Sequence, residues 1–502
     1  MVLQSNWCHH FFQQLTGVNP FDGDCLPSRI RLFRTGRPTL PFPHPWNYKD
    51  PIQIFESFYA EAEKETGCGK HNRYLYAAGM PPVFLSRDPE IIRAIQSATG
   101  AKPGQFDRDT APTAGIARGT GEDSLLYSNG EVWRRHKRRS ARPFSRSNLF
   151  QPEKFHGFEK TFRATIGKRL QILREQQKAN GKQHTKLKLE PEIRVVMLEM
   201  LVNNFFGSSV PYDELRDRFV PSLVYLIEHM ILDTVAPRAY AFCRFFTGEN
   251  RVLNRCKYDL EILTDIALSG REKGLGLWSQ FQSTASNNAL RSNIRVFLAG
   301  AMEATSSFAC WALSHLSRRP DIQEQIHKEV RNLDSYDPDN FASCRKLNRV
   351  LEETLRLTPS LYFLPRKATE DTWVETSDKR RMLIPKDTTI RLDIWHSNRC
   401  EEFWGESISG YPALEFAPER WDILGEKGKS IRDMLHFGFG HGPRHCPGRY
   451  LGLLEVGLVV GAIVKVFKFS SVTKKTHVMA GVSTKPDDGV LVNLELREQW
   501  KK

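Results

Sequence analysis

The segment HFGFGHGPRHCPGRYLG, residues 436–452, constrains the possible structure of this chain more than any other stretch. It places a lone Cys446 in a turn of glycine, proline and arginine, directly ahead of a long apolar run. A disulfide needs a partner cysteine, and a zinc site needs further ligands nearby. A thiolate that binds a metal from one side matches the loop better, because glycine turns direct backbone N–H groups at the sulfur. A helix that begins just after Cys446 also keeps the sulfur ionised.

Composition narrows the classes of protein that remain. The chain has 502 residues, of which 40% are hydrophobic, enough to build a sizeable core. Its nine cysteines are spread singly and form no Cys-x-x-Cys pair, which argues against a zinc ribbon or an iron–sulfur cluster. The formal net charge of +14 suits an acidic protein partner, an anionic membrane surface or nucleic acid. Nucleic acid is not expected, because no interleaved aromatic residues or recognised nucleic-acid motif accompany the basic stretches.

The spacing of six residues in the loop is more specific than its composition. These residues are Phe439, Gly440, Gly442, Arg444, Cys446 and Gly448. The pattern resembles the haem-binding signature of the cytochrome P-450 superfamily, and the chain looks like a eukaryotic, fungal-like member. The resemblance implies a mainly α fold with small β-sheets, the cytochrome P-450 fold, with haem b between a long distal helix and the cysteine loop. It also implies that Cys446 is the metal ligand and that the cofactor is bound by Phe439, Gly440, Arg444 and Gly448.

Three further motifs precede the cysteine loop in the order that the superfamily shows. EETLRLTP, residues 352–359, places Glu353 and Arg356 on one face of a predicted helix. FAPERW, residues 416–421, supplies Arg420. By resemblance these three residues form a structural charge network, because buried charges must be paired. PRKAT, residues 365–369, supplies Arg366, which by resemblance binds a haem propionate.

The stretch NGEVWRRHKRRSARPFS, residues 129–145, resembles the superfamily helix that crosses one edge of the haem. The resemblance makes Trp133 and Lys137 cofactor-binding residues. Lys137 stands where the superfamily carries arginine, so the charge is kept but the bidentate fork is lost. The arginines around it have two interpretations: a solvated face, or a docking patch for an acidic redox partner such as NADPH–cytochrome P-450 reductase. The resemblance favours docking.

The segment VFLAGAMEATSSFACWALSHL, residues 296–316, is predicted to be a buried helix whose small residues let a flat cofactor and dioxygen approach. The superfamily pattern puts Glu303 at its acidic position and Ala304 where the oxygen-activating threonine usually lies. Ala304 cannot donate a proton. Either Thr305 takes the role through a locally distorted turn, or a substrate hydroxyl or a water chain from Glu303 does. The other interpretation of Thr305 is a mid-helix hydroxyl bonded to the carbonyl four residues earlier. Glu303 and Thr305 are the predicted catalytic residues.

The leading hypothesis is a haem-thiolate monooxygenase that inserts one oxygen atom from dioxygen into a small apolar substrate, by hydroxylation or epoxidation, in secondary metabolism. The cysteine loop lies near the end of the chain, so electrons from NADPH are expected through a separate reductase. Two alternatives stay open: a peroxide-using or rearranging haem-thiolate enzyme, suggested by Ala304, and a non-catalytic haem-binding protein. The expected substrate contacts are Phe297, Ala301, Tyr362 and Phe363.

The predicted organisation is a leader over residues 1–34 and one cytochrome P-450 domain over residues 35–502. Asp88 and Pro89 open one predicted helix. Other helices are expected at 131–140, 153–175, 190–206, 211–230, 252–270, 290–317, 320–333, 342–357 and 451–467, and short strands within 73–86, 361–395 and 466–498. No signal-peptide pattern and no run of 18 apolar residues occurs, so no membrane-spanning segment is expected. The expected location is the cytoplasm or the cytoplasmic face of the endoplasmic reticulum, with at most a peripheral membrane contact.

Overall fold

The computed structural model describes most of the chain after residue 51. The described residues are 52–53, 55–56, 58–59, 70–75, 83–100, 105–179, 185–235, 237–273, 276–281, 286–333, 338–427 and 436–498. They form two compact units: the described residues up to 112 and those within 361–414 and 429–446 make unit 1, and the described residues within 113–360, 415–428 and 447–502 make unit 2. The predicted leader over residues 1–34 lies outside the described residues.

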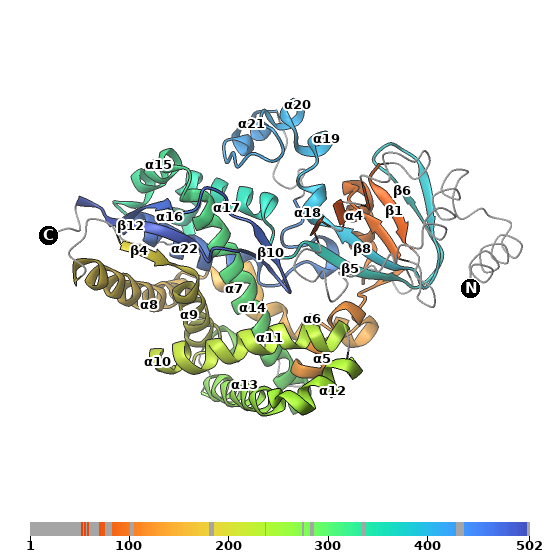
Figure 1. Ribbon diagram of the computed structural model, residues 1–502, viewed down its shortest axis with the longest axis horizontal. Coiled ribbons are helices and arrows are strands. Elements are labelled where there is room, and N and C mark those ends of the chain that lie inside the picture. Colours follow the sequence, from red (N-terminus) through yellow and green to blue (C-terminus); the bar gives the residue numbers. More distant parts are fainter. Residues whose placement is uncertain are drawn as a thin grey trace, which may run out of the picture. The chain divides into compact units, whose positions relative to one another are not determined.

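Unit 1 contains a five-stranded sheet whose strands come from distant parts of the chain. In sheet order they are β1 (Asn72–Leu75), β2 (Val83–Ser86), β8 (Thr389–Asp393), β5 (Phe363–Ala368) and β3 (Phe106–Asp107). Strands β2 and β8 pair in parallel, and the other pairs are antiparallel. In Figure 1 the orange β1 therefore belongs to the same sheet as the cyan β8 and β5. A hairpin of β6 (Thr372–Glu375) and β7 (Arg381–Ile384) completes the strands described in this unit.

Helix α4 (Pro89–Ala98) covers one side of the unit 1 core, and its start follows from the sequence. Asp88 is the N-cap, and its Oδ1 accepts hydrogen bonds from the backbone N–H groups of Glu90 and Ile91 at 2.9 and 3.4 Å. Pro89 occupies the first turn, where its missing N–H costs nothing. The predicted start of this helix is confirmed. Short helices α18 (Ile394–Ser397), α19 (Glu401–Trp404) and α20 (Glu406–Ser409), and the 3-10 turn η6 (Gly442–Arg444), also lie in unit 1.

Unit 2 contains the long helices and several short ones. They are α5 (Ala114–Thr120), α6 (Gly130–Phe144), α7 (Arg146–Leu149), α8 (Pro152–Ala179), α9 (Glu190–Met200), α10 (Tyr212–Glu214), α11 (Val220–Val235), α12 (Pro237–Thr247), α13 (Glu249–Glu272), α14 (Asn287–Leu316), α15 (Pro320–Val330), α16 (Pro338–Ser343), α17 (Arg345–Leu357), α21 (Arg420–Glu426) and α22 (Arg449–Val466). Segments Leu201–Phe205 and Leu215–Phe219 are π-helical. The prediction of a mainly α fold with small sheets is confirmed.

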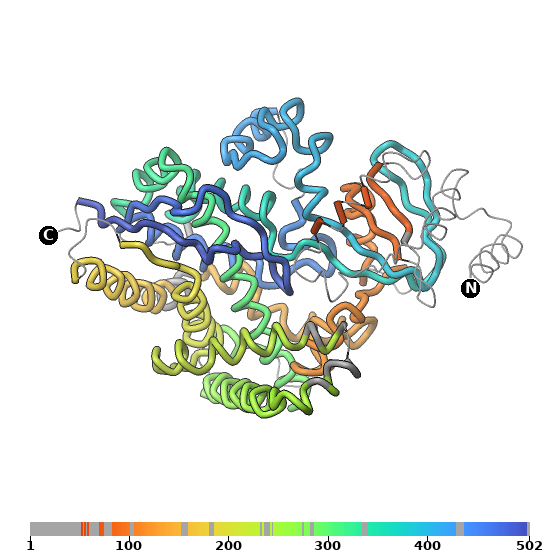
Figure 2. Tube along the Cα trace, viewed as in Figure 1, coloured from red at the N-terminus to blue at the C-terminus, as the bar shows by residue number. Residues whose placement is uncertain are grey.

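Two small sheets accompany these helices in unit 2. One has the order β4 (Thr185–Lys188), β12 (Leu491–Leu496) and β9 (Phe467–Ser471), and the other pairs β10 (Val478–Ala480) with β11 (Thr484–Pro486). Figure 2 shows the yellow β4 segment beside the dark blue C-terminal strands. The sequence patterns did not indicate α5, α12, α16 or α21, because each is short and lacks a long apolar period.

Helix α14 runs through the core of unit 2. Among the described residues it is the one helix long and apolar enough to cross a membrane, and 72% of its most apolar window is buried. That burial is typical of the core helix of a globular unit.

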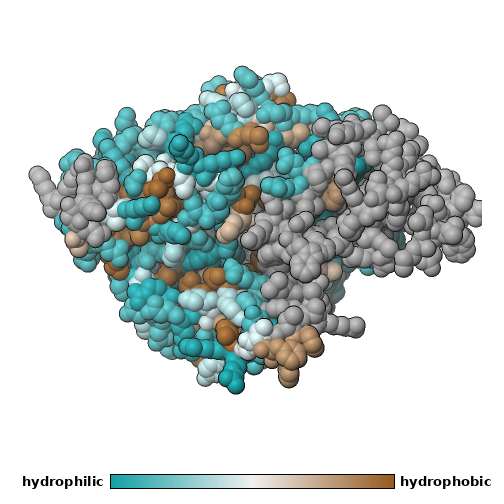
Figure 3. All heavy atoms as spheres, in the orientation of Figure 1, coloured by the Kyte–Doolittle hydropathy of each residue, from teal (hydrophilic) through white to brown (hydrophobic). Residues whose placement is uncertain are grey.

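Helix α12 instead exposes apolar side chains: Phe242, Phe245 and Phe246 are 68%, 75% and 69% exposed. Figure 3 shows this apolar patch at the lower edge of the visible face.

Candidate functional site

The cysteine loop of unit 1 is a tight turn held by its own backbone. The N–H of Cys446 donates to the Phe439 carbonyl at 2.7 Å, and the N–H of Gly440 donates to the Phe437 carbonyl at 2.8 Å. Gly440 and Gly442 adopt φ angles of +69° and +66°, which side chains other than glycine rarely adopt. The loop therefore places the half-buried Cys446 in a fixed position, and α22 begins three residues later along the chain, after the N-cap Gly448.

Helix α4 contacts this loop. The Gln96 side-chain Oε1 accepts a hydrogen bond from the His441 N–H at 2.8 Å. A Cβ atom added at Gly442 would collide with the Gln96 carbonyl oxygen, so the two backbones approach closely. The sequence analysis missed Gln96. The available signal was a polar residue on the buried face of an otherwise apolar helix.

Three arginines of unit 1 gather close enough to repel one another. Burial, together with the charges of Arg108 and Arg444, lowers the pKa of the Arg366 guanidinium to about 9. Burial and Arg108 likewise lower the pKa of Arg444 to about 9, against the opposing charge of Asp107. A buried cluster with more cations than anions fits a ligand that brings its own carboxylates, as the two propionates of haem do. Arg108 was not singled out from the sequence.

The Glu353 network of unit 2 is complete in itself. Arg356 donates from Nε and Nη2 to the two Glu353 carboxylate oxygens at 2.9 and 2.8 Å, and Arg420 donates from Nε at 2.9 Å. The indole N–H of Trp421 and the backbone N–H of Ala417 fill further positions on the same carboxylate, each at 3.1 Å. All three charged side chains are fully buried. The sequence did not indicate the parts played by Trp421 and Ala417.

Helix α6 carries the residues expected at one edge of the cofactor. Trp133 is 4% exposed, and the Lys137 ammonium lies 5.2 Å from the centre of its ring. Glu131 accepts hydrogen bonds from Arg134 and Arg138, both at 2.9 Å, so part of the basic stretch is neutralised within the helix. Other arginines on the helix, Arg135 and Arg142, are exposed to solvent.

One face of α14 is incompletely covered although the helix lies in the core. Gly300 is exposed, Ala301, Ala304 and Thr305 are half-buried, and a Cβ atom added at Gly300 would meet no atom within 4 Å. These residues share one side of the helix because Gly300 lies four positions before Ala304, and Ala301 lies four positions before Thr305. The face is lined by small side chains and has room beside it, which fits the flat ligand expected from the sequence.

Phe297 continues this face but is already packed. Its ring centre lies 5.2 Å from those of Phe144 and Trp278 and 6.1 Å from that of Phe205. In unit 1, the other predicted substrate contacts are also packed: Tyr362 and Phe363 lie 6.2 and 6.0 Å from Phe55. The structure thus places the predicted apolar contacts within aromatic clusters of their own units.

Glu303 points into the protein, away from the uncovered face of α14. Its carboxylate bonds Arg194 of α9 at 2.6 Å and accepts a hydrogen bond from the Ser483 hydroxyl at 2.6 Å. Burial raises the pKa of Glu303, but the Arg194 charge and hydrogen bond, with Lys485 and Ser483, outweigh it, so the net pKa is lowered. Glu303 is therefore an ionised acceptor near neutral pH. Arg194 and Ser483 were not predicted, since neither has a local sequence signal.

Thr305 adopts the second of its two expected arrangements. Its hydroxyl donates to the Ala301 carbonyl at 2.7 Å. Helix α14 is α-helical without interruption from Asn287 to Leu316, so the locally distorted turn expected around Thr305 does not occur. The reason is that the hydroxyl bonds back within the helix and needs no opening of the backbone.

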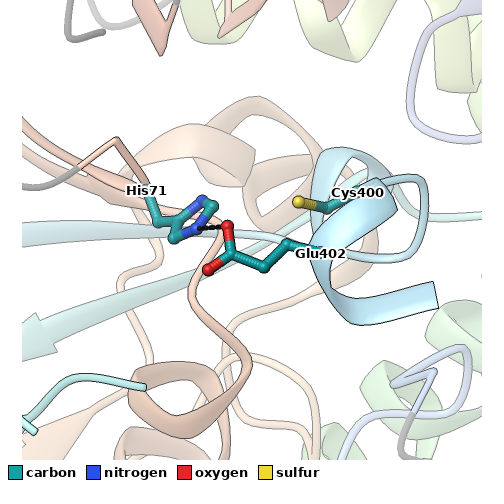
Figure 4. Close-up of side chains that lie close together, drawn as sticks. All are labelled: His71, Cys400 and Glu402. Atoms are coloured by element: carbon teal, nitrogen blue, oxygen red, sulfur yellow. Dashed lines mark hydrogen bonds and ion pairs between the residues drawn. The ribbon is translucent and has the colours of Figure 1, made fainter. Parts of the chain in front are cut away.

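A second group of ligand-type side chains lies in unit 1, at the ends of β1 and α19. His71, Cys400 and Glu402 have their polar atoms within 4.8 Å of one another, as Figure 4 shows. Lys70 bonds Glu402 at 2.6 Å, and the Arg87 Nε donates to the His71 Nδ1 at 3.2 Å. These two cations would repel a divalent metal ion. We therefore interpret the three side chains as part of a charge network between the segment before β1 and the start of α19.

Comparisons with known proteins identify the family. The family model for cytochrome P450 matches residues 38–492. A cytokinin hydroxylase of Arabidopsis thaliana is 26% identical over 84% of this chain and 80% of its own length. The cytochrome P-450 monooxygenase FSL4 of Gibberella zeae is 28% identical over 64% of this chain and 56% of its own length. Cytochrome P-450 52A3-B of Candida maltosa is 23% identical over 81% of this chain.

The chain belongs to the cytochrome P-450 family. Its fold class is the one that the family defines, and it is a haem-dependent oxidoreductase of the monooxygenase type. The resemblance first seen in the cysteine loop is confirmed by a match that covers most of the chain.

Proposed function

We propose that this enzyme binds haem b through the Cys446 thiolate and inserts one atom of dioxygen into a small apolar molecule of secondary metabolism. The observation that carries the proposal is the cluster of Arg366, Arg444 and Arg108 in the same unit as the cysteine loop. Its excess positive charge suits the two propionates, and the loop suits a single anionic sulfur ligand. Haem bound there supplies the oxygen-activating chemistry.

The protein's own residues would then have separate tasks. Cys446 holds the iron, Phe439, Gly440 and Gly448 shape the loop, and Arg366 and Arg444 pair with the propionates. Trp133 and Lys137 of α6 bind one edge of the cofactor, and the Glu353 network keeps the surrounding core rigid. On α14, the uncovered face around Ala301 admits the substrate, which the apolar surroundings orient while excluding water. Glu303 and Thr305 are the proposed catalytic residues of this helix.

The electrons are proposed to come from NADPH through a separate acidic reductase. The exposed arginines of α6 support this, because a basic surface raises the rate of encounter with an acidic protein. We place the enzyme in the cytoplasm or at the cytoplasmic face of the endoplasmic reticulum. The exposed phenylalanines of α12 are suited to a peripheral contact with a membrane surface.

Replacing Cys446 by alanine tests the axial ligand. We expect the carbon monoxide difference spectrum of Cys446→Ala to lose the thiolate-type band, because no other residue of the loop offers an anionic soft ligand. Cys400→Ala is the matched control, since Cys400 is also a half-buried cysteine of unit 1. A thiolate-type band that survives in Cys446→Ala, or disappears in Cys400→Ala, would contradict the assignment.

Charge reversal on α6 tests the reductase surface. Arg135→Glu with Arg142→Glu should slow reduction by NADPH–cytochrome P-450 reductase about tenfold at low salt, because steering depends on opposite charge. The difference should shrink as ionic strength rises. Stopped-flow reduction under carbon monoxide measures the rate. Equal rates for the two proteins at every salt concentration would assign these arginines to the solvated face instead.

A further inference from the structure

Helix α14 has no side-chain hydroxyl at Ala304, and another segment of the chain supplies one. A threonine at this position in the family motif would place a hydroxyl there, and alanine cannot. Thr305, the next residue, directs its hydroxyl proton at the Ala301 carbonyl. Glu303 is engaged by Arg194 and Ser483. Neither neighbour along the helix therefore places a hydroxyl at the Ala304 position.

A hydroxyl reaches this position from outside the helix. Ser360 follows the end of α17 by three residues, and its Oγ donates to the Ala304 carbonyl at 3.0 Å. The Ser360 side chain is nearly buried, since the residue is 8% exposed. A serine hydroxyl has one proton and two lone pairs, so this hydrogen bond leaves its accepting capacity available.

The segment that carries Ser360 is clamped to α14 through Thr484 of β11. The Thr484 N–H donates to the Ser360 carbonyl at 2.8 Å, and the Thr484 hydroxyl donates to the Pro359 carbonyl at 2.8 Å. On the helix side, the Trp311 indole N–H donates to the Thr484 hydroxyl at 3.1 Å, and the Ser307 hydroxyl donates to the Thr484 carbonyl at 2.5 Å. Two of these hydrogen bonds hold the Pro359–Ser360 backbone to Thr484, and the other two hold Thr484 to the helix, so the segment that carries the hydroxyl is fixed against the helix.

We propose that Ser360 replaces, from the segment after α17, the hydroxyl that α14 lacks at Ala304, and that it positions the water which delivers protons during oxygen cleavage. The inference rests on the proposed function. Ser360 is a positioning residue: its own proton stays on the Ala304 carbonyl, and a lone pair accepts a hydrogen bond from the water. The proton that the water gives up is replaced from bulk solvent, so the serine undergoes no net change.

The test uses haem-loaded protein and cumene hydroperoxide, which needs neither the native substrate nor a reductase. When the O–O bond breaks heterolytically, the leaving alkoxide takes a proton and becomes cumyl alcohol. When it breaks homolytically, the alkoxyl radical loses a methyl radical and becomes acetophenone. Ser360→Ala should lower the ratio of alcohol to ketone about tenfold, because proton delivery contributes at least that much to such steps. Ser292→Ala is the matched control: it removes a buried serine hydroxyl of the same helix that lies outside the clamp, and it should keep the wild-type ratio.

Moving the hydroxyl back to the helix separates a positioning role from a structural one. Ala304→Thr combined with Ser360→Ala should restore the ratio, and Ser360→Thr, which retains a hydroxyl, should keep it. The infrared stretching frequency of carbon monoxide on the reduced protein gives a second readout. It should shift in Ser360→Ala, stay unchanged in Ser292→Ala and return in the double variant, since it responds to hydrogen-bond donation by the water that the hydroxyl positions.

Each outcome of these measurements either supports or overturns the inference. An unchanged ratio and frequency in Ser360→Ala would overturn the inference, as would a loss that Ala304→Thr fails to restore. A thiolate-type carbon monoxide band in every variant keeps the proposed function standing in those cases. Its absence from the wild-type protein would instead reject the proposed function itself.

Discussion

Two clusters of arginine in this protein differ in how their positive charge is balanced. Arg356 and Arg420 share the Glu353 carboxylate, which also accepts two N–H groups, so the cluster is satisfied by the chain itself. Burial, together with repulsion from Arg108, lowers the pKa values of Arg366 and Arg444 to about 9. The difference distinguishes a charge network that is complete within the chain from a cluster of cations that would be stabilised if an anion bound.

Breaking the self-contained cluster should have the largest effect. Glu353→Gln leaves two buried guanidinium groups without their shared anion, which costs about 3–5 kcal/mol in the free energy of unfolding. Urea unfolding followed by circular dichroism measures the loss, and Glu131→Gln on the exposed side of α6 is the control. If Glu353→Gln were as stable as the wild type, the network would not hold the core.

Glu455 extends the comparison to a buried carboxyl group. Burial in α22 raises the pKa of Glu455 to about 8, from its ordinary value of 4.5. The stability that this group contributes is fully present below about pH 4.5 and is lost as the pH rises through about 8, because the folded state holds the proton more tightly. Glu455→Gln should therefore be more stable than the wild type above pH 8, by roughly 4–5 kcal/mol, and nearly equal to it below pH 5.

Urea unfolding of Glu455→Gln and wild-type protein at a series of pH values measures this difference. A difference that does not change with pH would mean that Glu455 is stabilised by interactions other than its proton.

Breaking the second arginine cluster should affect the cofactor more than the fold. Arg366→Met removes a charge that the folded protein carries at a cost, so the free energy of unfolding should change by less than about 1 kcal/mol. Release of haem to apomyoglobin should become about tenfold faster, because one charge-assisted hydrogen bond to a propionate is lost. Arg356→Met is the paired variant and should unfold the protein instead. Normal haem retention in Arg366→Met would remove the basis for assigning the propionates to this cluster.

Much of the fold followed from local patterns. Asp88 and Pro89 marked the start of α4, and the long apolar segments marked α14 and α22. The cysteine loop could be predicted for the same reason. Gly440 and Gly442 adopt positive φ angles that favour glycine, so the residue type indicates the backbone conformation. Helices such as α12 were not predicted from the sequence, because so few residues show too little apolar periodicity.

The same distinction between local patterns and distant contacts applies to the candidate site. By itself the sequence determined which residue can act as a soft anionic ligand, Cys446, and which helix carries the small side chains and the alanine at position 304. Local spacing along the chain was enough for these. It could not determine that Arg194 neutralises Glu303 from 109 residues away, or that Thr305 bonds back to Ala301 without a distorted turn.

The tertiary structure alone decided the partners of these groups. Arg108 joins Arg366 and Arg444, Gln96 supports the cysteine loop, and Ser360 brings a hydroxyl to Ala304 across 56 residues of chain. The physical reason is that a hydrogen bond or a charge repulsion depends on separations of a few ångström. For residues far apart in the sequence, only the packing of the folded chain sets those separations.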